Sequence, residues 1–169
     1  SKPGVALANE GFDGIVLKKG EKYDLSLWAR QLEGKAGKLT VRLVDEKGDI
    51  VAEKNLSAPA TGKWKKMNAV LIAKSDADKA QLQVIPSMVG KVGLDMVSLF
   101  PQKTFKGRKN GLRADLAQIL ADMKPRFVRF PGGCVSHGDG LHNMYRWVNT
   151  VGPLEARKPM RNIWNYHQS

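Results

Sequence analysis

The first 101 residues alternate apolar and polar side chains with a period of two, and no other feature of this sequence constrains the fold as strongly. In segment 22–30, KYDLSLWAR, one side carries Tyr23, Leu25, Leu27 and Ala29, and the other carries Asp24, Ser26, Trp28 and Arg30. Similar runs occur at 38–45, 50–52, 67–73, 81–85 and 92–99, with Gly-containing turn signals at 18–21, 46–49 and 60–63. Short alternating strands separated by turns predict an antiparallel β-sandwich of the jelly-roll type for residues 1–101.

After Pro101 the apolar period changes from that of a strand to that of a helix. Within segment 110–125, one helical stripe is formed by Leu112, Leu116, Ile119, Leu120 and Met123. Asn110 can cap the start of this helix, and Pro125 ends it because proline disfavours α geometry in the residue before it. The pattern therefore predicts a helix between these two residues.

A second alternating run, RFVRF at 126–130, follows the helix and stops at Pro131-Gly132-Gly133. It predicts a short strand that delivers polar side chains to a tight loop. A helix that leads into a strand is half of a β/α repeat, and one such unit cannot cover its own apolar faces. Residues 102–169 are therefore interpreted as the incomplete opening of a larger α/β domain.

The net charge of +12 suggests a nucleic-acid ligand, but its distribution along the chain argues against one. Residues 102–169 carry most of the excess, with 12 basic residues against 4 acidic ones, and their balancing acids could lie elsewhere in a larger domain. In residues 1–101 the lysines are scattered along strands and turns, as on a solvated face. We therefore expect no nucleic-acid partner.

Composition also limits the compartment and the contacts of the chain. The apolar runs are too short to span a membrane, so no membrane partner is expected. A single cysteine excludes an internal disulfide and leaves the compartment open. No basic-then-apolar leader opens the sequence. An exposed stripe on the helix would make a homo-oligomer possible.

Several motifs, taken in order, resemble the α-L-arabinofuranosidases of glycoside hydrolase family 51. They are LDMVSLFPQKTFKGRKNGLRADLAQILADMKPRFVRFPGG from residue 94, YRWVNTVGPLEARKP from residue 145 and NIWNY from residue 162. The segment NEGFDGIVLKKGEKYDLSLWAR, from residue 9, resembles the β-sandwich that many of these enzymes carry, which is related to family 4-type carbohydrate-binding modules.

This resemblance implies a retaining glycosidase on a (β/α)8 barrel that acts on arabinose-containing polysaccharides of hemicellulose or pectin. The predicted fold class is then mainly β: a jelly-roll sandwich at 1–101 followed at 102–169 by a partial β/α segment of a truncated barrel. The remainder of that barrel would be a partner. A periplasmic or secreted location is favoured for the parent protein.

The resemblance also assigns candidate substrate-binding residues to the loop after the predicted strand. Barrel enzymes build their sites from loops that follow strand C-termini, which is where Arg129 and the glycines Gly132 and Gly133 fall. Arg129 would orient carboxylates or sugar hydroxyls, and Cys134 would line the sugar subsite. Trp147 could stack against a sugar ring or could pack beneath a loop.

No catalytic residue is assigned to this chain. Retaining hydrolysis needs two carboxyl groups about 5–5.5 Å apart. Glu155 lies in a Gly-Pro-x-Glu loop motif that matches neither catalytic glutamate motif of the family. The chain alone is therefore expected to be inactive.

The loop that contains Cys134 could also be interpreted as a zinc site or as a site with a reactive thiol, but the sequence supports both interpretations less well. Cys134 and His137 have a permissible zinc spacing, but a site would also need His142 and the distant His167. Nothing marks Cys134 as an activated thiolate. No metal and no cofactor are expected.

The sandwich could bind sugar by itself, which makes a non-catalytic carbohydrate-binding module the alternative function. By alternation Tyr23 belongs to the core, whereas Trp28 points away from it. Trp28 is therefore the candidate sugar-binding residue of the sandwich. It could equally contact the barrel.

Overall fold

The computed structural model describes residues 5–35, 37–87, 89–164 and 167–168 of the chain. It is mainly β, and its strands pair in antiparallel sheets. Its contacts divide the chain into two compact units, residues 1–119 and residues 120–169. Each unit is described by itself below. None of the helices in the described residues is long and apolar enough to cross a membrane.

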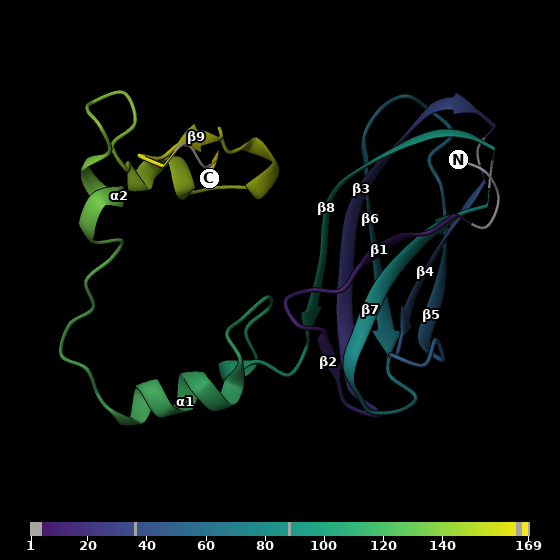
Figure 1. The fold of residues 1–169 in the computed structure, drawn as a ribbon, viewed down its shortest axis with the longest axis horizontal. Coiled ribbons are helices and arrows are strands. Elements are labelled where there is room, and N and C mark those ends of the chain that lie inside the picture. The colour runs from purple at the N-terminus through teal and green to yellow at the C-terminus, as the bar shows by residue number, and fades with distance from the viewer. Residues whose placement is uncertain (1–4, 36, 88, 165–166, 169) are drawn as a thin grey trace. The chain divides into compact units, whose positions relative to one another are not determined.

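Two antiparallel sheets make up most of the first unit (Figure 1). Its strands are β1 (Leu7–Asn9), β2 (Ile15–Leu17), β3 (Lys22–Gly34), β4 (Lys38–Val44), β5 (Ile50–Ser57), β6 (Lys65–Ile72), β7 (Ala77–Pro86) and β8 (Gly90–Pro101). One sheet has the order β1-β7-β4-β5, with β2 also paired to β7, and the other has the order β6-β3-β8. Each segment predicted as a strand in residues 1–101 lies within one of the strands β3 to β8, apart from one or two end residues. β1 and β2 are additional.

The inward sides of both sheets meet in one hydrophobic core. Leu25 and Leu27 of β3 and Leu39, Val41 and Leu43 of β4 are almost completely buried and belong to the same cluster. Complete burial of such a side chain contributes roughly 1.5–3 kcal/mol to folding. The period-two pattern therefore identified which side of each strand faces the core.

The outward side of β3 carries half-buried Asp24, Ser26, Trp28 and Arg30. The register between β3 and β8 shifts between Ser26 and Trp28, so β8 has an irregularity opposite this position. Bulges of this kind increase local twist and redirect side chains. The sequence correctly placed Trp28 on the side away from the core.

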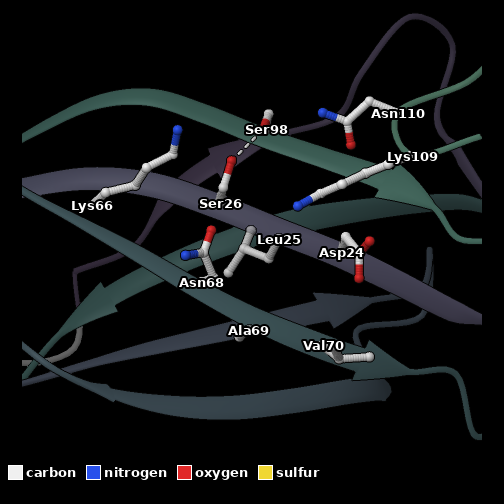
Figure 2. A pocket seen from close by; sticks show the side chains of 10 residues that line it. All are labelled: Asp24, Leu25, Ser26, Lys66, Asn68, Ala69, Val70, Ser98, Lys109 and Asn110. Atoms are coloured by element: carbon white, nitrogen blue, oxygen red, sulfur yellow. Dashed lines mark hydrogen bonds between the residues drawn. The ribbon is translucent and has the colours of Figure 1, made fainter. Parts of the chain in front are cut away.

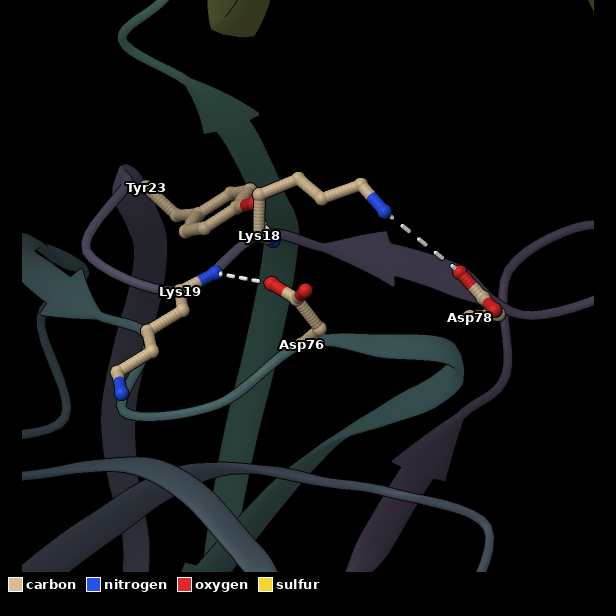
Figure 3. Close-up of polar contacts among 5 residues, drawn as sticks. All are labelled: Lys18, Lys19, Tyr23, Asp76 and Asp78. Atoms are coloured by element: carbon tan, nitrogen blue, oxygen red, sulfur yellow. Dashed lines mark hydrogen bonds and ion pairs between the residues drawn. The ribbon is translucent and has the colours of Figure 1, made fainter.

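Tyr23 is buried at one end of the sandwich, where it fixes the turn before β3 (Figure 3). Its hydroxyl oxygen accepts a hydrogen bond from the backbone N–H of Lys18 at 2.9 Å. The next backbone N–H, from Lys19, donates to Asp76 Oδ1 at 2.6 Å, and Lys18 Nζ lies 3.9 Å from Asp78 Oδ1. Turn 18–21 is thereby tied both to β3 and to the start of β7.

Burial raises the pKa of Tyr23 above its ordinary value of 10.0, and the hydrogen bond from Lys18 opposes this only in part. Because the unfolded chain then loses its phenolic proton at a lower pH than the folded chain, stability is complete below pH 10 and falls as the pH rises above it. We expect Tyr23→Phe to make the free energy of unfolding, measured by urea titration, less dependent on pH between 9 and 11.

Tyr145→Phe is the matched control, since Tyr145 lies in the second unit and outside the sandwich core. This variant should keep the alkaline slope of the wild type. Equal slopes for Tyr23→Phe and the wild type would show that the phenol of Tyr23 does not cause the alkaline loss of stability.

The predicted helix forms as α1 (Ala114–Asp122), which begins later than the sequence indicated. Asn110 has a φ of +50° and does not cap it. Segment 104–112 instead closes a loop around the 3-10 helix η1 (Phe105–Gly107), because the N–H of Phe105 donates to the carbonyl of Leu112. The predicted apolar stripe is exposed, as expected for a helix that lacks a partner. Leu116, Ile119 and Leu120 lie in α1, and Leu112 and Met123 lie just outside its two ends.

The predicted strand at 126–130 is absent from the structure, and this expectation is corrected. The segment pairs with no strand in the described residues, and Phe127, Val128 and Phe130 are exposed. A strand requires a hydrogen-bonded neighbour, and the described residues supply none here. The second unit instead contains α2 (Gly133–His137), the 3-10 helices η2 (Trp147–Thr150) and η3 (Leu154–Ala156), β9 (Met160–Arg161) and β10 (His167–Gln168).

Candidate functional sites

The loop predicted to line a sugar site runs from Arg129 into the first turn of α2. Gly132 and Gly133 have φ values of +74° and +59°, which L side chains rarely adopt, so the backbone itself requires glycine at both positions. Arg129 is exposed and folds back over Gly132, where an added Cβ would lie 3.5 Å from the Nε of Arg129. Cys134 is exposed. The structure thus places an arginine and a thiol on either side of a paired-glycine turn.

Tyr145 contacts this loop at two points. Its ring packs edge-on against Phe130, with ring centroids 6.0 Å apart and an interplanar angle of 84°. Its backbone N–H donates to the carbonyl of Ser136 at 3.2 Å. Contacts on both sides of the paired glycines therefore hold the shape of segment 130–136.

Asn143 organises the following turn, although no sequence pattern marks it as important. Its buried side-chain oxygen accepts hydrogen bonds from the N–H groups of Asp139 at 2.8 Å and Gly140 at 3.3 Å, and its amide donates to Asp139 Oδ2. Gly138 packs so closely against Asn143 that a Cβ would clash with it. The turn-forming run Gly-Asp-Gly was the only signal available. Asp139 is accordingly part of a structural turn.

Trp147 begins η2 and is exposed, so it does not pack beneath a loop in this structure. Trp164 is also exposed. Arg157 pins its loop through Nε and Nη2, which donate to the carbonyl of Gly152 at 3.3 and 3.0 Å. Arg129 and Gly132 are brought together, whereas Trp147 accepts a hydrogen bond on its carbonyl from Thr150 Oγ1 within its own helical turn.

Asp115, one of the few carboxyl groups after residue 101, has a structural role in a local ion pair. It forms a bidentate pair with Arg113, both contacts at 2.8 Å, and this bonding lowers the pKa of the Asp115 carboxyl. A carboxylate held ionised in this way is unsuited to act as a general acid at neutral pH. In the described ranges, no three His, Cys, Asp or Glu side chains gather as a metal site would require.

A second candidate site lies on the outward side of the β6-β3-β8 sheet (Figure 2). A shallow pocket of about 460 Å³ opens there, between β3, β6, β8 and the loop before α1. Its polar side chains are Asp24, Ser26, Lys66, Asn68, Ser98, Lys109 and Asn110. Alternation indicated the β3 side chains, but Lys109 and Asn110 come from a distant loop that no local pattern connects to the sheet.

Two tryptophans of the sandwich are each in contact with a cation, and one of these cations, Lys66, also lines the pocket. Lys66 Nζ lies 5.6 Å from the ring centroid of Trp28, its cross-strand partner, and Arg30 Cζ lies 4.6 Å from that of Trp64. Trp64 also reaches Gly93 of β8, where a Cβ would lie 3.3 Å from its ring edge. The small residue on β8 therefore leaves room for the ring to lie across the sheet.

Comparison with known proteins matches both parts of the chain to carbohydrate-related families. Residues 9–87 match the family described as a carbohydrate binding domain, and residues 119–169 match the α-L-arabinofuranosidase 1 domain. An extracellular exo-α-L-arabinofuranosidase of Streptomyces chartreusis is 37% identical over 98% of this chain, and α-L-arabinofuranosidase 1 of Arabidopsis thaliana is 40% identical over 96%.

The similarity extends to a solved structure. An arabinose-bound family 51 α-L-arabinofuranosidase is 35% identical and superposes with a TM-score of 0.81, covering 95% of this chain and 27% of its own. The chain spans only 21% and 24% of the bacterial and plant relatives. The sandwich and the segment that follows it are thus similar to parts of carbohydrate-active proteins. Over 95% of its length the chain aligns with a segment of a glycoside hydrolase family 51 α-L-arabinofuranosidase.

Proposed function

We propose that the protein containing this chain is a retaining α-L-arabinofuranosidase that acts on arabinose-containing plant polysaccharides. The observation that carries the proposal is the similarity over 95% of the chain to an arabinose-bound enzyme. In this proposal the loop of Arg129, Gly132, Gly133 and Cys134, together with Trp147, lines the subsite for the terminal sugar. Arg129 donates hydrogen bonds to a carboxylate or to sugar hydroxyls, and exposed Trp147 offers a ring face.

The catalytic carboxyl pair comes from outside these 169 residues in this proposal. A retaining mechanism needs an acid/base and a nucleophile about 5–5.5 Å apart. Asp115 is paired with Arg113, and Asp139 takes part in the Asn143 turn, so both already have structural roles. The chain then contributes substrate contacts and leaves bond cleavage to other segments.

The same proposal assigns the remaining architecture and partners. Residues 1–101 are a jelly-roll module and residues 102–169 are the opening of a (β/α)8 barrel, whose other strands pair with segment 126–130. The exposed apolar side chains of that segment and of α1 favour such a neighbour. A homo-oligomer would cover the same stripe. One relative is named extracellular, which favours a secreted or periplasmic parent.

An activity assay tests this proposal directly. The 169-residue chain should release no aryl leaving group from an aryl α-L-arabinofuranoside above the uncatalysed rate. In the intact parent protein, Arg129→Ala should lower kcat/KM by about 10²-fold, because a misplaced substrate loses that much rate. Turnover by the 169-residue chain that Glu155→Gln abolishes would contradict the proposal, as would full activity of the Arg129→Ala parent.

A non-catalytic carbohydrate-binding module remains a second candidate function for residues 1–101. The specific observation in its favour is the outward placement of Trp28 beside a polar pocket, within a region that matches a carbohydrate binding domain.

A further inference from the structure

We infer that Asp139 and Asn143 form a latch that positions the proposed sugar subsite at residues 129–134. Asn143 is then a positioning residue, which acts through its contacts with the chain. The inference rests on the proposed function, because it takes this loop to line the subsite for the terminal sugar. It gives a role in substrate binding to two side chains that otherwise only build a turn.

The latch is held by three side-chain hydrogen bonds within one turn. Asn143 Oδ1 accepts the backbone N–H groups of Asp139 at 2.8 Å and Gly140 at 3.3 Å, and Asn143 Nδ2 donates to Asp139 Oδ2 at 3.3 Å. The backbone N–H groups of Asn143 and Met144 donate to the carbonyl of Gly140 at 3.2 and 3.0 Å. Because Asn143 is only 7% exposed, little water can replace a partner that its amide loses.

Gly138 connects the latch to α2. Its backbone N–H ends that helix by donating to the carbonyl of Cys134 at 3.0 Å. Gly138 has a φ of +58°, and an added Cβ would overlap the side-chain oxygen of Asn143. The last turn of α2 therefore contacts the latch directly, and Cys134 lies one helical turn from that contact.

Tyr145 forms a second connection between the latch and the loop. Its backbone N–H donates to the carbonyl of Ser136 at 3.2 Å, and its ring packs edge-on against Phe130. Arg146 closes the same segment, since its Nη2 donates to the carbonyl of Leu141 at 3.3 Å. Residues 138–146 thus form one hydrogen-bonded loop that contacts both ends of segment 130–136.

These connections matter because the proposed substrate contacts are exposed. The side chains of Arg129 and Cys134 are not fixed by burial, so their positions depend on the backbone that carries them. A substrate contact displaced by about 1 Å can cost up to 10²-fold in rate, and sites of this kind need supporting residues that hold the contacts in place. The latch is the buried polar group that supplies this support.

Asn143→Asp tests the latch, because it replaces the donating amide by a second carboxylate that repels Asp139. In the ¹⁵N-labelled 169-residue chain, the backbone amide hydrogens of Gly138, Gly140 and Tyr145 should exchange with solvent at least about tenfold faster than in the wild type. The sandwich should stay folded, as circular dichroism verifies.

The intact parent protein gives the second readout. Asn143→Asp should raise KM for an aryl α-L-arabinofuranoside about tenfold and change kcat less than about twofold, because a displaced subsite binds the sugar less tightly. Partial unfolding would instead reduce the number of active molecules, which lowers the apparent kcat and leaves KM unchanged. The split between KM and kcat therefore separates positioning from a loss of stability.

The double variant Asp139→Asn, Asn143→Asp exchanges the two groups without changing the net charge. The amide at position 139 can then donate to the carboxylate at position 143, so amide exchange and KM should return close to wild-type values. Asn55→Asp is the matched control, since it makes the same change to an exposed side chain of β5 that accepts a hydrogen bond from Thr40 Oγ1 at 2.7 Å. It should alter neither quantity.

The two readouts distinguish this inference from the proposed function. Wild-type amide exchange in Asn143→Asp would overturn the latch, as would a double variant that stays folded but restores neither quantity. Faster exchange with an unchanged KM in an active parent would reject the positioning role and leave the proposed function intact. A wild-type parent that does not cleave the arabinofuranoside would overturn the proposed function and the positioning role together, whereas amide exchange still reports on the latch itself.

Discussion

Leu27→Ala should lower the free energy of unfolding of the sandwich by 2–5 kcal/mol, on the order of what deletion of a buried leucine side chain costs. Leu27 is completely buried in the middle of β3, the central strand of its sheet, and pairs with Met67 of β6. Its truncation removes apolar contacts and leaves a cavity in the core shared by both sheets. Because domains of this size are stable by roughly 5–15 kcal/mol, the loss is a large share of the total.

Urea denaturation followed by far-UV circular dichroism measures this effect. Leu32→Ala is a matched control, since it makes the same chemical change on the same strand where the side chain is 49% exposed. The control should cost well under half as much. Similar losses at both positions would show that the core does not lie on the side of β3 described here.

Gly90→Ala should destabilise the sandwich by roughly 2–4 kcal/mol, through backbone strain and overpacking together. Gly90 begins β8 with a φ of +143° and pairs with Gly34 at the end of β3. A Cβ there would overlap the carbonyl oxygen of Glu33. Strand ends can approach this closely only where neither residue has a side chain.

Gly20→Ala separates these two causes. Gly20 also has a positive φ, +81°, but a Cβ there meets no atom within 4 Å. It should therefore cost only the backbone strain, about 1 kcal/mol. Thermal unfolding of the two variants gives the difference, and equal melting temperatures would mean that close approach at Gly90 does not matter.

The features of the fold that could be predicted are those that follow from the polarity and spacing of neighbouring residues. Leu25 and Leu27 alternate with Ser26 and Trp28, and this alone indicates which side faces the core. In the same way the spacing of Leu116, Ile119 and Leu120 predicts a helix and an apolar stripe. Both inferences use only periodicity, which is set by backbone geometry.

The start of α1 and the segment 126–130 show where this reasoning fails. Asn110 is a good capping residue, but the hydrogen bond between Phe105 and Leu112 draws it into a loop. Segment 126–130 has a strand pattern but finds no partner in the described residues. Both outcomes depend on contacts, made or missing, with residues far along the chain, which no local pattern records.

The candidate sites divide in the same way. The paired glycines and Cys134 could be located from sequence because the turn requires glycine at fixed positions. The outward site on the β6-β3-β8 sheet could be predicted only as far as the β3 side chains. Its pocket also needs Asn68 and Lys109, and the ring of Trp64 needs space at Gly93, all of which come from separate segments.

By itself, therefore, the sequence determined the strands β3 to β8, the buried side of each, the helical stripe and the glycine turn, because these follow from side-chain periodicity and backbone sterics. Only the tertiary structure decided that Trp64 lies across Arg30 and Gly93 and that a pocket opens beside Trp28. Those features depend on strand register and on loops that meet in space, and they arise from long-range pairing that neighbouring residues do not encode.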